Sequence, residues 1–144
     1  MNSLPLSGVV ITLNEAGNIE RCLESLSFCD DLLVVDSGST DGTVEMAESM
    51  GARVLHNDWP GFGKQKQFGV QQARNDWVLC LDADEWLSDE LKTNIRSVLA
   101  GTPTAGAYRC PRRNLFLGKP LRFGGGYPDM KIRFFDRTLA RWSD

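Results

Sequence analysis

The stretch WVLCLDADEWLSDEL, residues 77–91, joins an apolar run to a crowd of acidic side chains. Residues 77–81 are apolar without interruption, which is typical of a strand buried on both faces of a sheet. Five carboxylates follow within nine positions, at residues 82, 84, 85, 89 and 90. Like charges this close repel one another, and folding alone does not require them there. We therefore expect some of these acids to serve a bound ligand.

Three further apolar runs precede this strand, and helical patterns alternate with them. The predicted strands are 8–13, 32–36, 52–56 and 77–81, and the predicted helices are 19–27, 43–51, 66–75 and 89–100. Ser88 is placed to cap the last helix, whose apolar residues recur at helical spacing. Four strand–helix alternations predict an α/β fold, with a mostly parallel central sheet and helices on both of its faces.

The composition excludes several classes of protein. A chain of 144 residues, 42% hydrophobic and 24% charged, is ordinary for one globular domain with one core. No apolar run reaches the roughly 18–20 residues of a membrane span, and the N-terminus lacks the features of a signal peptide. The four cysteines form no closely spaced pair, so neither a structural zinc site nor a disulfide framework is expected. We therefore expect a cytoplasmic protein.

Charge is distributed unevenly along the chain. Residues 1–104 carry a net charge of −9 and residues 105–144 one of +6, within a total of −3. This asymmetry favours one cationic and one anionic partner, although solvated surface charge gives the same pattern. No nucleic-acid partner is expected, because the aromatic residues do not form a stacking pattern and most of the chain is acidic. Beyond residue 105, short strands joined by Gly- and Pro-rich loops are predicted, and the absence of a terminating helix predicts a longer parent chain.

Polar residues follow the predicted strands at the edge where ligands bind in open α/β sheets. They are Thr12, Asn14 and Glu15 at the end of the first strand, Asp36 and Asp41 at the second, and Asp82 and Asp84 at the end of the fourth. Two carboxylates one residue apart suit Mg²⁺ or Mn²⁺, which complete their shells with substrate phosphates. A chance D-x-D in an acidic turn is the alternative. Glu85, Asp89 and Glu90 are expected at the N-terminus of the next helix rather than as ligands.

Two other segments are candidates for nucleotide contacts. Lys64 and Lys66 could each meet a diphosphate, and a solvated helix face explains either one equally well. The loop after Asp36 lacks the Gly-rich patterns of phosphate loops, so Asp36 is expected to accept hydrogen bonds from a nucleobase or ribose. A plain turn capped by Asp41 is the alternative.

These motifs, in this order, resemble those of the family 2 glycosyltransferases, which have the nucleotide-binding α/β fold called GT-A. The matching stretches are VVITLNEAGNIERCLESL (9–26), DLLVVDSGSTDGTVEMAESMGARV (31–54), QQARNDWVLCLDADEWLSDEL (71–91) and GGGYPDMKIRFFDR (124–137). With the last stretch included, the chain is most similar to the bacterial lipopolysaccharide-core branch. The resemblance implies that residues 1–104 form the nucleotide-sugar-binding part. Residues 105–144 would begin the acceptor-binding part of the same domain, which would be incomplete.

The resemblance also implies roles for individual residues. Thr12, Asn14 and Glu15 would border the nucleoside, Asp36 would hold the uracil, and Asp41 would line the nucleotide pocket. Asp82 and Asp84 would bind the ribose and the metal–diphosphate group, with Mg²⁺ or Mn²⁺ as the ion, and Lys64 is a further nucleotide-binding candidate. The general base of the family lies downstream of the D-x-D. Asp129 is the candidate here, with a base beyond residue 144 as the alternative.

The implied reaction is the inverting transfer of a sugar from a UDP-sugar to a lipopolysaccharide core or a related envelope glycan. The basic section from Arg109 to Arg141 favours an anionic glycolipid or glycan acceptor, and also peripheral contact with the inner face of the inner membrane. Transfer to a polyprenyl phosphate or a polysaccharide stays open, as does a truncated, catalytically weak nucleotide-sugar-binding module. A nucleotidyltransferase is disfavoured, because NEAGN (14–18) stands where a Gly-, Arg- and Lys-rich phosphate loop is needed.

Overall fold

The computed structural model describes residues 3–101, 103, 105–111 and 130–142. The strands are β1 (Leu4–Thr12), β2 (Cys29–Asp36), β3 (Arg53–His56), β4 (Trp77–Asp82), β5 (Ala107–Pro111) and β6 (Met130–Asp136). The helices are α1 (Ile19–Ser25), α2 (Thr43–Ser49), α3 (Phe62–Gln72) and α4 (Asp89–Ala100). Asp129, the candidate base, lies outside the described residues.

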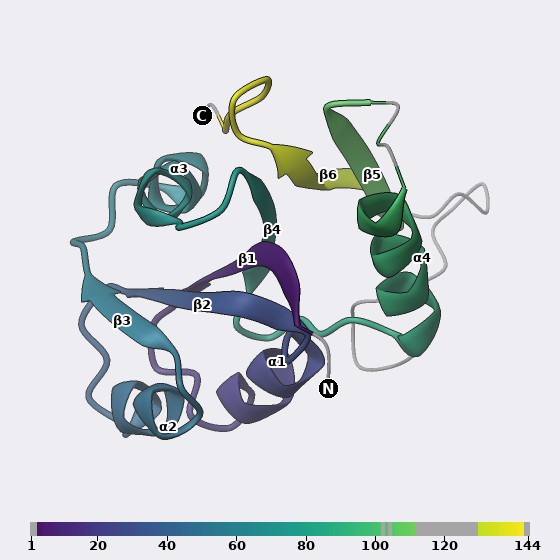
Figure 1. Cartoon of the computed structure of the whole chain (residues 1–144). Helices are drawn as coiled ribbons and strands as arrows, with labels where there is room; N and C mark the ends of the chain where they lie inside the picture. Colours follow the sequence, from purple (N-terminus) through teal and green to yellow (C-terminus); the bar gives the residue numbers. More distant parts are fainter. Residues whose placement is uncertain (1–2, 102, 104, 112–129, 143–144) are drawn as a thin grey trace, which may run out of the picture.

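The strands form one six-stranded sheet in the order β3-β2-β1-β4-β6-β5 (Figure 1). β1 pairs in parallel with β2 and β4, and β2 pairs in parallel with β3. β6 is antiparallel to both β4 and β5, so the later part of the chain extends the same sheet. The predicted fold class, a mostly parallel central sheet, is confirmed.

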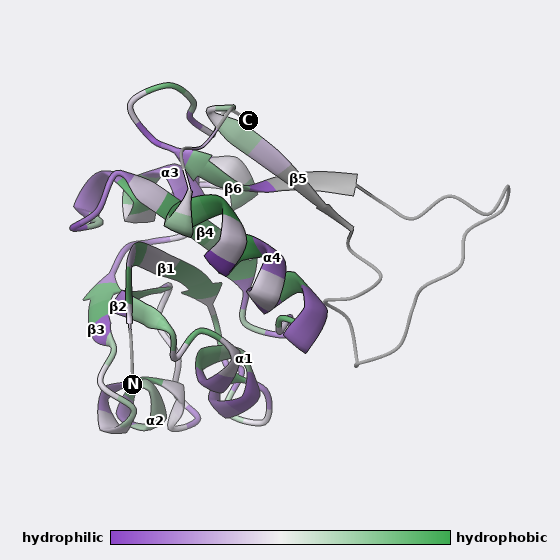
Figure 2. Ribbon diagram, turned by 45° about the vertical axis from the view of Figure 1, so that its right-hand side comes forward, coloured by the Kyte–Doolittle hydropathy of each residue, from purple (hydrophilic) through white to green (hydrophobic). Residues whose placement is uncertain are grey.

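Helices cover both faces of this sheet, as predicted. Leu23 of α1, Ala47 of α2 and Ile95 of α4 belong to one cluster of buried side chains. Val70 of α3 packs with Val9 of β1 in a second cluster on the opposite face. Figure 2 shows the hydrophobic strands between helices that also carry hydrophilic segments. The apolar runs therefore form strands that are buried on both faces.

Helix α3 starts and ends earlier than the predicted range 66–75. It begins at Phe62, directly after Gly61, whose φ of 121° is open to glycine. The Gly-rich sequence here therefore starts a helix rather than only interrupting one. At the other end, Arg74 and Asn75 leave the helix because their backbone N–H groups donate to Asp31 and Ser7. Within α3, a Cβ on Gly69 would lie 2.5 Å from Val9, so glycine permits the close approach to the sheet.

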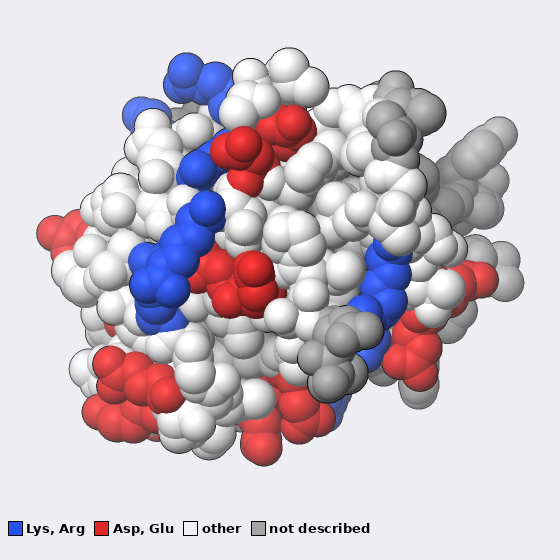
Figure 3. Space-filling model, viewed as in Figure 1, with Lys and Arg blue, Asp and Glu red and all other residues white. Residues whose placement is uncertain are grey.

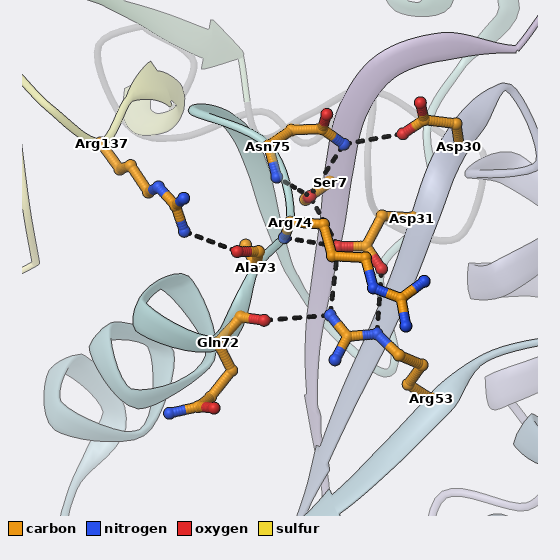
Figure 4. Close-up of polar contacts among 9 residues, drawn as sticks. All are labelled: Ser7, Asp30, Asp31, Arg53, Gln72, Ala73, Arg74, Asn75 and Arg137. Carbon is orange, nitrogen blue, oxygen red and sulfur yellow. Dashed lines mark hydrogen bonds and ion pairs between the residues drawn. The ribbon is translucent and has the colours of Figure 1, made fainter.

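A polar network joins the strands at their N-terminal ends (Figure 4). The carboxylate of Asp31 accepts hydrogen bonds from Ser7 Oγ at 2.7 Å, Arg53 Nε at 3.1 Å and the Arg74 backbone N–H at 2.9 Å. Burial alone would raise the pKa of Asp31, but these hydrogen bonds outweigh it and hold the pKa below its usual value. At this edge of the sheet, the polar side chains of neighbouring strands are therefore paired with one another.

On the face of the molecule shown in Figure 3, charges of the two signs are mixed, with basic and acidic side chains lying beside each other. Two basic residues of the C-terminal section are engaged internally. Arg133 is 3% exposed, and Arg137 donates to the carbonyl oxygens of Val70 and Ala73. These two arginines therefore add less positive charge to the surface than the count of basic residues in the sequence suggests.

Candidate functional site

The segment after β1 is fastened to the loop between β2 and α2. The backbone N–H of Asn14 donates to Ser39 Oγ, and Asn14 Oδ1 accepts from the Thr40 backbone N–H, at 2.7 and 2.8 Å. Asn14 has a φ of 53°, a conformation that asparagine adopts more readily than most residues. The backbone N–H of Glu15 donates to Thr43 Oγ1 at 2.9 Å. Two loops at the carboxyl edge of the sheet thus form one unit.

Asp36, at the end of β2, and Asp41, in the loop that follows, also bind within this unit. Asp36 Oδ2 accepts from the backbone N–H groups of Gly38 and Ser39, both at 2.9 Å. Asp41 accepts from the Thr43 hydroxyl and from the backbone N–H groups of Thr43 and Ala16. The Thr43 hydroxyl, followed by these backbone donors, lowers the pKa of Asp41. The capped-turn interpretation of Asp41 therefore describes its local contacts correctly.

Asp82 stands at the end of β4, next to a buried lysine. Lys66 Nζ lies 3.1 Å from Asp82 Oδ1, and the Lys66 side chain is only 7% exposed. The same ammonium lies 4.7 Å from the centre of the Trp142 ring, within the range of a cation–π contact. The Lys66 ammonium therefore partly neutralises the negative charge of the acidic turn, and its positive charge would attract a bound anion.

Glu85 does not occupy the position that the sequence predicted. Helix α4 begins at Asp89, with Ser88 Oγ accepting from the Leu91 backbone N–H, so Asp89 and Glu90 do lie in its first turn. Glu85 precedes the helix, is fully buried and forms an ion pair with Arg133 of β6 at 2.7 Å. Its placement at the helix N-terminus was wrong, because local spacing does not reveal a partner on a strand much later in the chain.

A pocket of about 480 Å³ opens beside these elements. It is lined by Ile11, Thr12, Leu13, Glu15, Trp59, Phe62, Asp82, Ala83 and Asp84. Two buried oxygens at this edge, Thr12 Oγ1 and Asp82 Oδ1, have no hydrogen-bond partner among the described residues, although Lys66 lies within ion-pair distance of the second. Buried polar atoms are normally paired, so Thr12 Oγ1 points to a ligand or to water as its missing partner, whereas Asp82 Oδ1 has Lys66 beside it.

The rim of the pocket is apolar and exposed. Leu13 is 50% exposed, Trp59 49% and Phe62 65%. The Trp59 and Phe62 rings contact each other edge to face, with their centres 4.8 Å apart. A mouth that combines apolar surface with a few convergent polar groups is typical of small-molecule sites.

The model of the family described as "Glycosyl transferase family 2" matches residues 7–126. The chain belongs to this family. The predicted family is thereby confirmed, and the sheet order and the pocket at its carboxyl edge belong to a family 2 glycosyltransferase.

Several curated relatives resemble this glycosyltransferase chain. It is 36% identical over 135 residues to the lipopolysaccharide core biosynthesis glycosyltransferase LpsC of Rhizobium meliloti, covering 90% of this chain and 48% of LpsC. It is 47% identical over 96 residues to a glycosyltransferase of Rickettsia bellii, covering 66% of this chain and 33% of the relative. This chain thus spans half or less of the length of these relatives.

Solved structures show the same fold. Glucosyl-3-phosphoglycerate synthase of Mycobacterium tuberculosis, in complex with Mn²⁺, UDP and glucosyl-3-phosphoglycerate, is 30% identical with a TM-score of 0.56, over 67% of this chain and 40% of that one. The mannosyltransferase PcManGT of Pyrobaculum calidifontis, in complex with GDP-Man and Mn²⁺, has a TM-score of 0.68 over 96% of this chain and 46% of that one. At 20% identity, this second likeness shows the fold alone.

The structure brings most of the predicted site residues of this glycosyltransferase to one edge. Thr12, Glu15, Asp82 and Asp84 line the pocket. Asn14 and Asp41 lie in the two adjoining loops, and each binds the other's loop. Asp36 ends β2 and binds the loop that follows it. The roles that the resemblance assigns to these residues stay predictions.

The two lysines of α3 have different positions. Lys66 contacts Asp82, whereas Lys64 lines another pocket, with Phe68, Arg141 and Trp142 among its neighbours. Two residues along a helix correspond to about 200° of rotation, which separates their side chains. Lys66 is therefore the lysine that the structure brings to the D-x-D turn, residues 82–84.

Three large residues of the pocket rim were not predicted as site residues. They are Leu13, Trp59 and Phe62, and the last two belong to the segment 57–69, whose Trp and Phe residues were noted without a role. Large apolar side chains in a Gly- and Pro-rich loop that directly follows a strand are the pattern that could have indicated them, because such loops are usually polar.

The pocket can accommodate a divalent ion only with help from a ligand. Among the described residues, no group of three or more His, Cys, Asp or Glu side chains is arranged to hold a metal. Asp84 and Asp82 supply carboxylates, and Mg²⁺ or Mn²⁺ commonly takes one or two of these together with phosphate oxygens. The residues present therefore fit an ion that arrives with a diphosphate.

Within the described part of the chain, none of the helices has the length and apolarity of a membrane span.

Proposed function

We propose that this chain forms the donor-binding part of an inverting glycosyltransferase that takes a sugar from a UDP-sugar. The observation that carries the proposal is the pocket at the carboxyl edge of the sheet, where Thr12, Glu15, Asp82 and Asp84 converge. Support comes from glucosyl-3-phosphoglycerate synthase, a 30% identical structure described in complex with UDP and Mn²⁺. Residues 1–104 would hold the donor, and residues 105–144 would begin the acceptor side.

Within this site, Asp84 is the better candidate for the metal ion. Asp82 Oδ1 already lies 3.1 Å from Lys66 Nζ, which leaves Asp82 suited to the ribose and Lys66 to a phosphate oxygen. A bound Mg²⁺ or Mn²⁺ would act as a Lewis acid that stabilises charge on the leaving diphosphate. Thr12 Oγ1 would gain the partner that it lacks among the described residues.

The nucleoside would lie against the rim formed by Leu13, Trp59 and Phe62. Aromatic faces bind the flat face of a base in a way that excludes water. Asp36 would accept from the uracil, and Asn14, Glu15 and Asp41 would border the nucleoside. Because the Asp36 carboxylate also accepts from Gly38 and Ser39, its direction toward a base would be preset.

Inversion requires a base on the face of the sugar opposite the diphosphate, to take the proton of the acceptor hydroxyl. Asp129 stays our candidate for that role, with an acid beyond residue 144 as the alternative. A lipopolysaccharide core or related envelope glycan is the proposed acceptor, on the strength of the 36% identity to LpsC. Arg141 is exposed and could meet an anionic acceptor, whereas Arg133 is buried against Glu85. A cytoplasmic location with peripheral contact at the inner membrane belongs to the same proposal.

Calorimetric titration of UDP, with and without Mn²⁺, tests the donor site. Asp84→Asn should weaken the Mn²⁺-dependent binding by about 10–100-fold, since a charge-assisted contact contributes about 1.5–3 kcal/mol. Asp89→Asn is the matched control, because Asp89 is exposed and its carboxylate pairs with Lys92 of the same helix at 3.3 Å. GDP in place of UDP tests the base preference. Absence of UDP binding to the folded parent chain, or equal loss in both variants, would overturn the proposal.

A second candidate is a donor-binding module that transfers weakly or not at all. Such a module would hold the donor in the same pocket and would need no general base. Incubation with a UDP-sugar and lipopolysaccharide core distinguishes the two candidates. Formation of free UDP from the UDP-sugar only when the acceptor is present supports the transferase. Binding of the UDP-sugar without formation of free UDP supports the module.

A further inference from the structure

Glu85 is a buried carboxylate that binds two different parts of the chain. Its Oε1 accepts a hydrogen bond from the Asp82 backbone N–H at 2.8 Å. The same carboxylate forms two hydrogen bonds with Arg133, from Nη1 to Oε1 at 2.7 Å and from Nη2 to Oε2 at 3.0 Å. Glu85 is 0% exposed and Arg133 3%. Charges this far from water are costly unless they are paired, so this bidentate geometry is needed for either group to be buried.

Apart from Glu85 and the Lys66–Asp82 ion pair, backbone contacts within the described part of the chain hold the turn that carries Asp82 and Asp84. The Glu85 backbone N–H closes the turn on Asp82 O at 2.9 Å, and the Ala83 N–H donates to Ile11 O at 3.2 Å. Arg133 Nη1 also donates to the carbonyl oxygen of Cys80 at 3.4 Å, and Cys80 lies two residues before Asp82 in β4. Arg133 therefore holds both the strand end and, through Glu85, the first residue of the turn.

We propose that Glu85, whose buried charge Arg133 neutralises, positions the D-x-D turn. It would hold the Asp82 backbone, and with it the carboxylates of Asp82 and Asp84, in the orientation that a metal–diphosphate group requires. The proposal rests on the proposed function of this pocket. Groups that orient ligating carboxylates commonly affect metal affinity by about 10–100-fold when they are replaced.

Because Arg133 lies on β6, its contact with Glu85 links the D-x-D turn to a later part of the chain. Arg133 lies on β6, 48 residues after Glu85 in the chain, and β6 belongs to the section assigned to the acceptor side. β6 pairs directly with β4, from Trp77 to Leu79. Any movement of β6 that shifts Arg133 would therefore pull on the Asp82 turn, so that the acceptor side could influence the geometry of the donor side.

A double substitution separates positioning from simple core filling. Glu85→Leu with Arg133→Met replaces both charges by apolar groups of similar size, an exchange that often leaves stability unchanged. Glu85→Gln with Arg133→Met removes the same two charges but keeps an oxygen that can accept from the Asp82 N–H. Asp76→Asn is a further control, because it breaks an exposed ion pair with Arg137, next to the other end of β4. Thermal unfolding of every variant checks that each one is folded.

Two measurements are made on each folded variant: amide hydrogen exchange at Asp82 by NMR, and Mn²⁺-dependent UDP affinity by calorimetry. We expect the Leu/Met variant to lose protection at Asp82 and about 10–100-fold in affinity. The Gln/Met variant and Asp76→Asn should retain protection and stay within about threefold of the parent affinity, because the acceptor for the Asp82 N–H is kept.

The proposal is overturned if the Leu/Met variant is folded and matches the parent in both measurements, or if both double variants lose affinity equally. Should the Leu/Met variant fail to fold, Glu85→Asp replaces it, since it keeps the charge beside Arg133 while moving the acceptor away from Asp82. If the parent itself does not bind UDP, the proposed function fails. The exchange rate at Asp82 then still decides whether Glu85 holds the turn.

Discussion

The two ends of the parallel sheet use polar residues in opposite ways. At the N-terminal end, the Asp31 carboxylate is buried and accepts hydrogen bonds from Ser7, Arg53 and Arg74. At the carboxyl end, Thr12 Oγ1 is buried without a hydrogen-bond partner among the described residues. A paired network of this kind stabilises the fold, whereas unpaired buried oxygens reduce stability unless a ligand binds them. The contrast predicts that substitutions at the first end act on folding and that those at the second act on binding.

The largest effect is expected at the N-terminal end, from Asp31→Asn. It removes the charge that pairs with Arg53 and should lower the free energy of unfolding by about 2–4 kcal/mol. The affinity of the remaining folded protein for UDP should not change, because Asp31 lies at the far end of the strands. Urea unfolding and calorimetry below the unfolding transition check both statements. A loss of affinity in fully folded Asp31→Asn would contradict the division of roles.

The pH dependence of stability should follow the same carboxylate. Since hydrogen bonds hold the pKa of Asp31 below its usual value, its contribution is complete above the unfolded pKa of about 3.9. It is lost as the pH falls through the folded pKa. The stability difference between the parent and Asp31→Asn should therefore be constant near pH 7 and shrink below about pH 4. Urea unfolding across pH 3–7 measures this, and a difference that grows toward low pH would refute the assignment.

A pair of threonines tests the contrast within one residue type. Thr12→Val removes a hydroxyl that lacks a partner, so stability should stay the same or rise by up to about 1 kcal/mol, while UDP affinity falls. Thr43→Val removes a hydroxyl that donates to Asp41 and accepts from the Glu15 N–H, and should cost about 1–3 kcal/mol. Thermal unfolding compares the two. Equal stability losses would mean that Thr12 has a structural partner after all.

The smallest effect is expected at the rim of the pocket. Phe62 is 65% exposed, so Phe62→Ala should change the free energy of unfolding by less than about 0.5 kcal/mol. If the rim contacts the nucleoside, UDP affinity should fall by about 1 kcal/mol, or roughly fivefold. Leu139→Ala is the control, because Leu139 is 72% exposed and lines a different pocket. An unchanged affinity in Phe62→Ala would place the base elsewhere.

Much of the carboxyl edge could be predicted because strand ends are visible in the chain. Each apolar run ends where a polar residue begins, and parallel strands bring such ends to one edge, so Thr12, Glu15, Asp82 and Asp84 were found together. The start of α3 was missed because the same glycines that interrupt a pattern can also begin a helix. Arg133, Trp59 and Phe62 were missed because no short-range pattern links them to the acids.

The sequence by itself determined the fold class, the family and the edge of the sheet that carries the candidate site. These depend on periodicity and on the order of motifs, which act over a few residues and are preserved along the chain. Only the tertiary structure decided that Lys66, rather than Lys64, meets Asp82. It also decided that Glu85 is buried after the D-x-D turn and that Arg133 pairs with it. Those contacts depend on helix phase and on the insertion of β6 between β4 and β5, and they join residues too far apart in the chain for local spacing to record.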